Sequence, residues 1–190
     1  MGNSEIKHHA DYVNFTATTT KQESLELLLE SYKALSDSQD NWVCNLANCS
    51  SLLWHTYNNP SSSSSSEGQV NWSGFYVIDP QNPKQLILGP FMGKVACQQI
   101  QIGKGVCGTA ALKKETQLVK DVEKFPGHIA CDGETKSEIV VPILSVGDDG
   151  EKVLRGVLDI DCLKLEGFDE TDQKFLEELC RLIGSSCKWN

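Results

Sequence analysis

Three cysteines in the middle of the chain stand beside glycine or turn residues, where a thiol can face a pocket. Cys97 lies in KVACQQ, Cys107 in GKGVCGTAA and Cys131 in HIACDGE. A thiol in such a place is apolar filler, a metal ligand or a redox-active group. Cys107 starts a stretch that predicts a helix, and the unpaired N–H groups of a helix start stabilise a thiolate. Position alone leaves all three interpretations open.

Nearby side chains bear on these alternatives. His128 and Lys136 are close in sequence to Cys131, and either one as a cation lowers the pKa of a neighbouring thiol. A zinc site built from Cys97, Cys107, Cys131 and His128 is formally available. The chain has no close CxxC pair among them, which argues against such a site. We therefore expect no bound metal.

The remaining five cysteines have surroundings typical of filler positions, because four lie within helical patterns and one ends a strand. They are Cys44, Cys49, Cys180, Cys187 and Cys162. We assign them no chemical role.

Three carboxylates suggest a polar ligand. Asp159 and Asp161 alternate with Leu158 and Ile160 inside an apolar strand, so both acids point to one face. Two such acids are unfavourable unless they meet a cation, share a proton or bind a ligand, although a solvated sheet face is the simpler alternative. Glu138 starts the neighbouring strand, and hairpin pairing would bring it to the same area. Three acids near a thiol suit a substrate with an ammonium group, and they could protonate a leaving oxygen.

The elements that position these residues follow from hydrophobic periodicity and capping signals. Thr20 and Glu23 predict a capping box, and Asp169 predicts the cap of a final helix. The expected order is helices near 21–35 and 43–57, strands 74–79, 85–91 and 96–102, a short helix 105–115, strands 137–144 and 153–162, and a closing helix. This order predicts an α+β fold: a central antiparallel sheet with the N- and C-terminal helices packed on one face.

Length and charge limit the function classes. A chain of 190 residues predicts one domain, 1–190, with 1–19 as an N-terminal arm and 60–69 as a flexible serine-rich loop. The net charge of −9 argues against nucleic acid as a partner. No apolar run is long enough to span a membrane, and no secretory signal is visible. We expect a protein of the cytoplasm, with the nucleus as a second compartment, and mostly reduced thiols.

Five segments together resemble one family. NWSGFYV, LGPFMGKVAC, IGKGVCGTAA, PGHIACDGETKSEIVVPI and GVLDIDC closely resemble the free methionine-(R)-sulfoxide reductases, single GAF-domain enzymes, and their fungal members most of all. The resemblance implies a GAF-like fold and thiol-dependent reduction of free L-methionine (R)-S-oxide to methionine. It also implies a cysteine sulfenic acid, then an intramolecular disulfide that thioredoxin reduces, with no further cofactor. The rival from another class is a GAF-type sensor that binds a small ligand without turnover.

The resemblance also implies roles for the cysteines. Cys131 becomes the nucleophile and Cys97 the residue that resolves the sulfenic acid. Cys107 is a second resolving residue or, in a rival assignment, the attacking one. The pairing implied by this scheme is a Cys97–Cys131 bridge.

By the same resemblance, Glu138, Asp159 and Asp161 bind the ammonium and sulfoxide groups, with one of them kept protonated. Trp72 and Tyr76 form a wall around the methyl group and sulfur, although simple core packing is the alternative for both rings. The sequence leaves open which acid donates the proton and whether the chain forms a homodimer.

Overall fold

The computed structural model describes residues 20–59, 69–128, 132–147 and 149–189. The predicted arm 1–19, nearly all of the serine-rich loop and Cys131 therefore lie outside the described residues. Among the residues described, no helix is both long enough and apolar enough to cross a membrane.

The centre of the fold is a six-stranded sheet in which every described pairing is antiparallel. Its strand order is β3-β2-β1-β6-β5-β4, so the long strands β1 and β6 occupy the middle. The strands are β1 (Val70–Asp79), β2 (Asn82–Gly93), β3 (Gln99–Gln101), β4 (Gln117–Val119), β5 (Ser137–Val146) and β6 (Lys152–Cys162).

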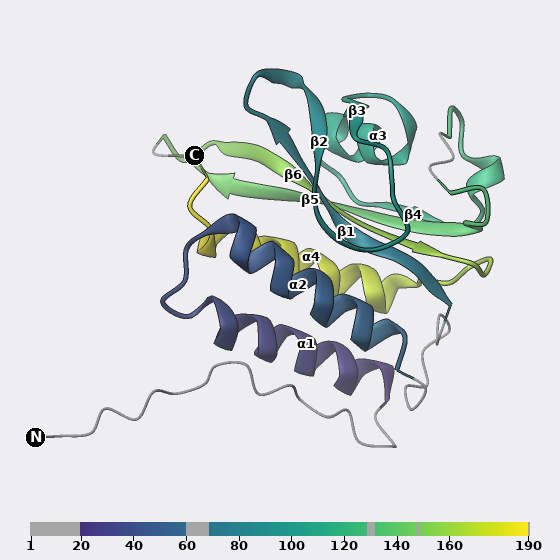
Figure 1. Cartoon of the computed structure of the whole chain (residues 1–190), viewed down its shortest axis with the longest axis horizontal. Helices are drawn as coiled ribbons and strands as arrows, with labels where there is room; N and C mark the ends of the chain where they lie inside the picture. The colour runs from purple at the N-terminus through teal and green to yellow at the C-terminus, as the bar shows by residue number, and fades with distance from the viewer. Residues whose placement is uncertain (1–19, 60–68, 129–131, 148, 190) are drawn as a thin grey trace, which may run out of the picture.

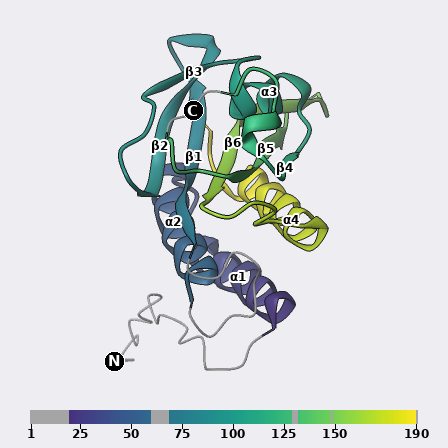
Figure 2. The ribbon, with the colours of Figure 1, turned by 90° about the vertical axis from the view of Figure 1, so that its right-hand side faces the viewer.

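Helices cover the two faces of this sheet unequally (Figure 1). On one face α2 (Trp42–Tyr57) and α4 (Glu170–Ser186) lie against the strands, and α1 (Lys21–Ser36) lies outside them. On the other face lies α3 (Gly105–Lys113), and Figure 2 shows it apart from the three-helix layer. A 3₁₀ turn, η1, spans Val122–Lys124. The predicted α+β architecture, with the N- and C-terminal helices on one face, is confirmed.

The helix starts follow the predicted caps. Thr20 and Glu23 form the capping box of α1, and Asp169 caps α4 by accepting hydrogen bonds from the N–H groups of Thr171 and Asp172. On α4, Gly184 lets the helix lie close to the sheet, because a Cβ there would be 2.0 Å from the carbonyl oxygen of Leu144. These contacts anchor the helical layer.

Apart from shifted strand ends, the predicted strands differ from the observed ones in two places. The segment 96–102 is a strand only over Gln99–Gln101, so Cys97 lies in the preceding loop. The three-residue strand β4 and the turn η1 were not predicted, because segments of that length contain too little periodicity to be recognised.

The strand register explains how the acids meet. In antiparallel pairs, residues directly opposite each other point to the same face. Asp161 of β6 pairs with Glu138 of β5 and with Trp72 of β1, and Asp159 pairs with Gly74. All of these residues point to the α3 face, away from the three-helix layer. The prediction that Asp159 and Asp161 share a face is confirmed, and Glu138 joins them.

Candidate active site

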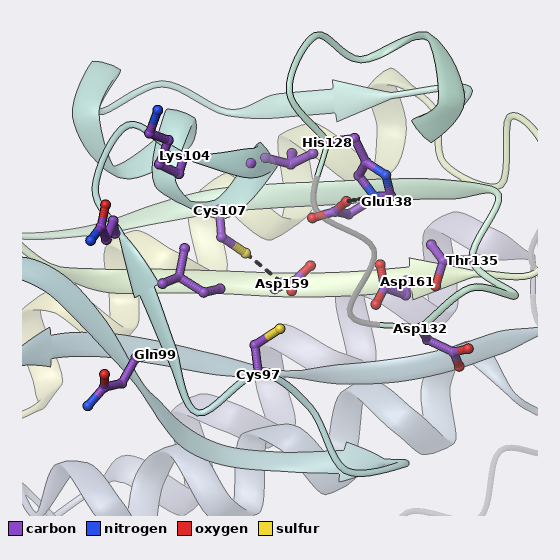
Figure 3. Close-up of a pocket in the computed structure, with 14 residues that line it drawn as sticks. Cys97, Gln99, Lys104, Cys107, His128, Asp132, Thr135, Glu138, Asp159 and Asp161 are labelled. Carbon is purple, nitrogen blue, oxygen red and sulfur yellow. Dashed lines mark hydrogen bonds and ion pairs between the residues drawn. The ribbon is translucent and has the colours of Figure 1, made fainter.

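A cavity of about 240 Å³ lies between the acid-bearing ends of β5 and β6 and the start of α3 (Figure 3). Segments distant in sequence form its walls: β3 and the loop before it, the start of α3, the chain before β5, and strands β5 and β6. The lining residues are Cys97, Gln99, Ile100, Gln101, Lys104, Gly105, Val106, Cys107, His128, Asp132, Thr135, Glu138, Asp159 and Asp161. The structure therefore brings together every predicted thiol and carboxylate of the site that it describes.

The start of α3 fixes Cys107 over the sheet. Gly105 has a φ of 61°, which suits glycine, and it turns the chain into the helix. At Gly108 a Cβ would lie 2.4 Å from the carbonyl oxygen of Gln101, so only glycine lets α3 pack so closely on β3. Buried Cys107 then donates a hydrogen bond from Sγ to Oδ2 of Asp159 at 3.2 Å, the dashed line in Figure 3.

The three acids form one electrostatic unit. Burial raises the pKa of Asp159 to about 6, against hydrogen bonds from Cys107 and Glu138 that lower it. Burial, followed by the charges of its two acidic neighbours, raises the pKa of Glu138 well above its ordinary value. Burial and the charge of Asp159 raise the pKa of Asp161 in the same way. With a pKa of about 6, Asp159 is mainly ionised at neutral pH, and burial together with its charge favours the protonated forms of Glu138 and Asp161.

The thiol of Cys107 does not behave as its helical position suggested. Burial, followed by the charges of Asp159 and Glu138, raises the pKa of this thiol well above its ordinary value. The expectation of a stabilised thiolate at the start of α3 is therefore wrong. The positive end of a short helix is outweighed by desolvation and by acids that arrive from two strands.

His128 lies at the rim of the acid cluster. Its Nε2 atom is 3.9 Å from Oε2 of Glu138, and Figure 3 shows the two side chains next to each other. Burial lowers the pKa of His128, so the imidazole is neutral at physiological pH. In that state it does not neutralise Glu138.

Cys97 is the described half of a disulfide, whereas the other six described cysteines carry free thiols. The predicted partner, Cys131, lies outside the described residues, so the Cys97–Cys131 pairing stays a prediction. The hydroxyl of Tyr76 donates a hydrogen bond to the carbonyl oxygen of Cys97 at 3.0 Å, which holds this loop to β1. Of the five cysteines expected to have no role, Cys44 is exposed and the other four are buried.

The predicted aromatic wall lies on the acid face of the sheet but not in the cavity lining. Trp72 stacks between Tyr76 and Phe91, with ring centroids 5.7 and 5.3 Å apart, and Trp72 and Tyr76 are almost fully buried. The indole Nε1 of Trp72 is buried without a hydrogen-bond partner among the described residues. Trp72 is paired with Asp161 across β1 and β6, and Tyr76 packs against Trp72. The contact of either ring with a substrate stays a prediction.

Several lining residues were not predicted, among them Gln99, Lys104, Asp132 and Thr135. The amide of Asn71 donates hydrogen bonds to Asp132 and Thr135 at 3.2 and 3.1 Å, which fastens this loop to β1. Lys104 is the N-cap residue of α3 and forms no side-chain cap there. The sequence offered two signals that these residues lie in loops near the site: the glycines on either side of Lys104 and the turn-forming residues after Cys131.

The zinc set considered from sequence does not form. With Cys97 in a disulfide, its sulfur is not available as a ligand. Among the described residues, one group combines the donor atoms a metal needs: the sulfur of Cys107 and one oxygen each from Glu138 and Asp159, all within 4.8 Å of one another.

Comparisons with known proteins cover most of the chain. Residues 68–186 match the family model for the GAF domain. The free methionine-R-sulfoxide reductase of Saccharomyces cerevisiae is 60% identical over 187 residues, which are 98% of each chain. A solved structure of a GAF domain has a TM-score of 0.85 at 60% identity, covering 97% of this chain and 99% of that one. The free methionine-R-sulfoxide reductase of Neisseria meningitidis, solved in complex with its substrate, has a TM-score of 0.74 at 36% identity, covering 88% and 90%.

Proposed function

This chain belongs to the GAF-domain family of free methionine-R-sulfoxide reductases, and we propose that it reduces free L-methionine (R)-S-oxide by a thiol mechanism in the cavity beside α3. The observation that carries the proposal is a buried acid cluster facing a thiol, with one carboxylate oxygen, Oδ1 of Asp159, lacking a hydrogen-bond partner among the described residues. An unpaired buried acid requires a ligand to satisfy it. The ammonium group of a free amino acid is such a ligand.

The protonation pattern of the acids fits a sulfoxide substrate. Ionised Asp159 attracts the ammonium group, while Glu138 or Asp161 can donate a hydrogen bond and then a proton to the sulfoxide oxygen. An acid that keeps its proton at neutral pH is needed, because the oxygen leaves the substrate sulfur only when protonated. Peptide-bound methionine sulfoxide lacks the free ammonium group and would leave Asp159 unpaired.

We assign the attack to Cys131 by its motif. Its thiolate bonds to the substrate sulfur, the S–O bond breaks, and the protonated oxygen ends on the cysteine as a sulfenic acid. The substrate sulfur gains two electrons and the cysteine sulfur loses two. The raised pKa of Cys107 supports this choice, because a protonated thiol is a poor nucleophile.

We assign to Cys97 the second step, in which the sulfenic acid on Cys131 is resolved. The Cys97 thiol condenses with the sulfenic acid, water leaves, and a disulfide forms that a thioredoxin reduces by exchange. The disulfide-bonded state of Cys97 supports its role in this redox cycle. Buried Cys107 faces the same cavity and is the second candidate for resolution.

The testing experiment is a turnover assay with free methionine-R-sulfoxide and dithiothreitol, read as methionine formed. The S epimer and N-acetylmethionine sulfoxide serve as substrates that should not be reduced. Cys131→Ser should abolish the product, and Cys44→Ser is the matched control, because Cys44 is an exposed thiol on α2 outside the cavity. An absence of methionine from folded wild-type protein would refute the proposal and favour a ligand sensor.

A further inference from the structure

Three side-chain atoms in the cavity lie close enough together to bind one metal ion, which the reduction of methionine sulfoxide does not require. Sγ of Cys107 and one carboxylate oxygen each of Glu138 and Asp159 lie within 4.8 Å of one another. All three side chains are at least nine-tenths buried. Oδ1 of Asp159 is also buried and accepts no hydrogen bond from the described residues. Without substrate, Oδ1 of Asp159 therefore offers lone pairs that no described protein group takes up.

No fixed cation balances this group. Within the described part of the chain, neither Lys nor Arg forms an ion pair with Glu138 or Asp159, and the one charged-type partner is His128 at 3.9 Å from Glu138. The exposed Lys94 pairs instead with Asp132 and Glu134. Buried carboxylates without a partner favour any cation that can enter.

The spacing of the atoms fits a small divalent ion. Zn²⁺ bonds sulfur at about 2.3 Å and carboxylate oxygen at about 2.0–2.2 Å, so tetrahedral donor atoms lie roughly 3.3–3.8 Å apart. The Cys107 sulfur is already 3.2 Å from Oδ2 of Asp159. Rotation about the side-chain bonds of Glu138 can bring its carboxylate oxygen from within 4.8 Å to this distance, because Glu138 lines the open cavity. Three protein ligands with a water molecule in the fourth position are a common zinc arrangement.

We propose that this cavity, when free of substrate, binds one divalent thiophilic cation, Zn²⁺ fitting best, through Cys107, Glu138 and Asp159. On binding, the Cys107 thiol and the Glu138 carboxylic acid each release a proton to solvent, so the sulfur binds as a thiolate and Glu138 as a carboxylate, and a water molecule takes the fourth position. His128, with Nε2 3.9 Å from Oε2 of Glu138, would serve as the outer partner that orients this ligand once the ion is bound. A thiol ligand disfavours Mg²⁺ and Ca²⁺, which prefer oxygen alone.

The ion would occupy the place that we assign to the substrate ammonium group. Zn²⁺ is therefore an inhibitor that competes with methionine sulfoxide, and neither a structural ion nor a cofactor of the reaction. Reductase activity would fall as free zinc rises, through a single reversible binding event. This consequence rests on the proposed function, whereas metal binding itself does not.

Metal binding can be measured without substrate by titrating oxidised protein with Co²⁺ and following the thiolate-to-cobalt charge-transfer absorption. With Cys97 in its disulfide, Cys107 carries the one free thiol among the described cavity residues. We expect a band that saturates at one equivalent and disappears when Zn²⁺ displaces Co²⁺. Cys107→Ser should remove the band, and Asp159→Asn should weaken binding further than His128→Ala, which should weaken it about 10–100-fold.

The matched control is Cys44→Ser, which removes an exposed thiol on α2 and should leave the titration unchanged. Circular dichroism confirms that each variant is folded. A charge-transfer band that persists in Cys107→Ser, or that is absent from wild type, overturns the proposal, and so does an unchanged affinity in folded Asp159→Asn. In the activity assay, Zn²⁺ should raise KM and leave kcat unchanged. Failure of the reductase assay alone would contradict the proposed function and leave the titration result intact.

Discussion

Neutralising Asp159 should stabilise the protein while destroying its function. Asp159 is mainly ionised at neutral pH although it is buried and one of its oxygens has no hydrogen-bond partner among the residues described. An asparagine keeps the shape and still accepts the hydrogen bond from Cys107, but it carries no charge to desolvate. Asp159→Asn should therefore raise the free energy of unfolding and abolish recognition of the ammonium group, a trade-off typical of functional sites.

The size of the effect follows from the pKa. The pKa of Asp159 rises from 3.8 in the reference state to about 6 in the fold. Between these values the folded form binds a proton that the unfolded form has lost, so wild-type stability falls as the pH rises through this window. Linkage gives a loss of about 0.5 kcal/mol at pH 4, about 1.5 at pH 5 and about 3 at pH 8. The asparagine variant lacks this loss.

Urea unfolding of wild type and Asp159→Asn at these pH values measures the difference directly, provided the urea dependence of both proteins is equal. The advantage of the variant should grow by about 2.5 kcal/mol from pH 4 to pH 8. Asp79→Asn is the control of opposite sign, because hydrogen bonds from Gln81 and Gln85 lower the pKa of Asp79 and its charge stabilises the fold at neutral pH. A difference between wild type and Asp159→Asn that does not change with pH would refute the reasoning.

Three further outcomes are expected. Asp172→Ala removes one of the two acids paired with Lys21, which keeps Asp169, and leaves the buried hydroxyl of Tyr57 without its acceptor. It should lower the free energy of unfolding by about 1–3 kcal/mol, measured by urea denaturation, and an unchanged free energy would contradict it. Gly108→Ala places a Cβ 2.4 Å from the Gln101 carbonyl oxygen. It should lower stability by about 1–3 kcal/mol and also reduce kcat/KM, because α3 must shift. Finally, kcat/KM should fall about tenfold per pH unit below about 6, where Asp159 becomes protonated and loses its attraction for ammonium, and a flat profile there would exclude that role.

The sequence was most informative where local pattern decides structure. The alternation of Asp159 and Asp161 with Leu158 and Ile160 predicted a shared face, since side chains of a strand alternate whatever the rest of the fold does. Glu138 could be added because the hairpin joins its strand to theirs. Whether these acids line a binding site or a solvated sheet face depends on the burial of Asp159. The sequence could not predict this burial, because it arises where α3 and the loop before β3 cover the acids.

The sequence was least informative where long-range partners decide chemistry. At Cys107 the local rule predicted a stabilised thiolate, but the acids that raise the thiol pKa arrive from strands about thirty to fifty residues further along the chain. The loop position of Cys97 was missed because its apolar neighbours imitate a strand over 96–102. Lys104 and Asp132 line the cavity only because distant segments of the chain meet there, and no short sequence motif predicts that contact.

The sheet separates the sources of stability from the site. Ile139, Leu158 and Ile160 point to the three-helix layer and are fully buried there. Their neighbours along the same strands are the acids of the cavity, which point to the opposite face. A typical domain is stable by only about 5–15 kcal/mol, so the roughly 3 kcal/mol lost at Asp159 is a large fraction. The apolar face offsets that loss, because each alternate residue of the same strands contributes burial on the opposite side. A pocket of unpaired acids can thus persist at the ends of β5 and β6 until a ligand neutralises it.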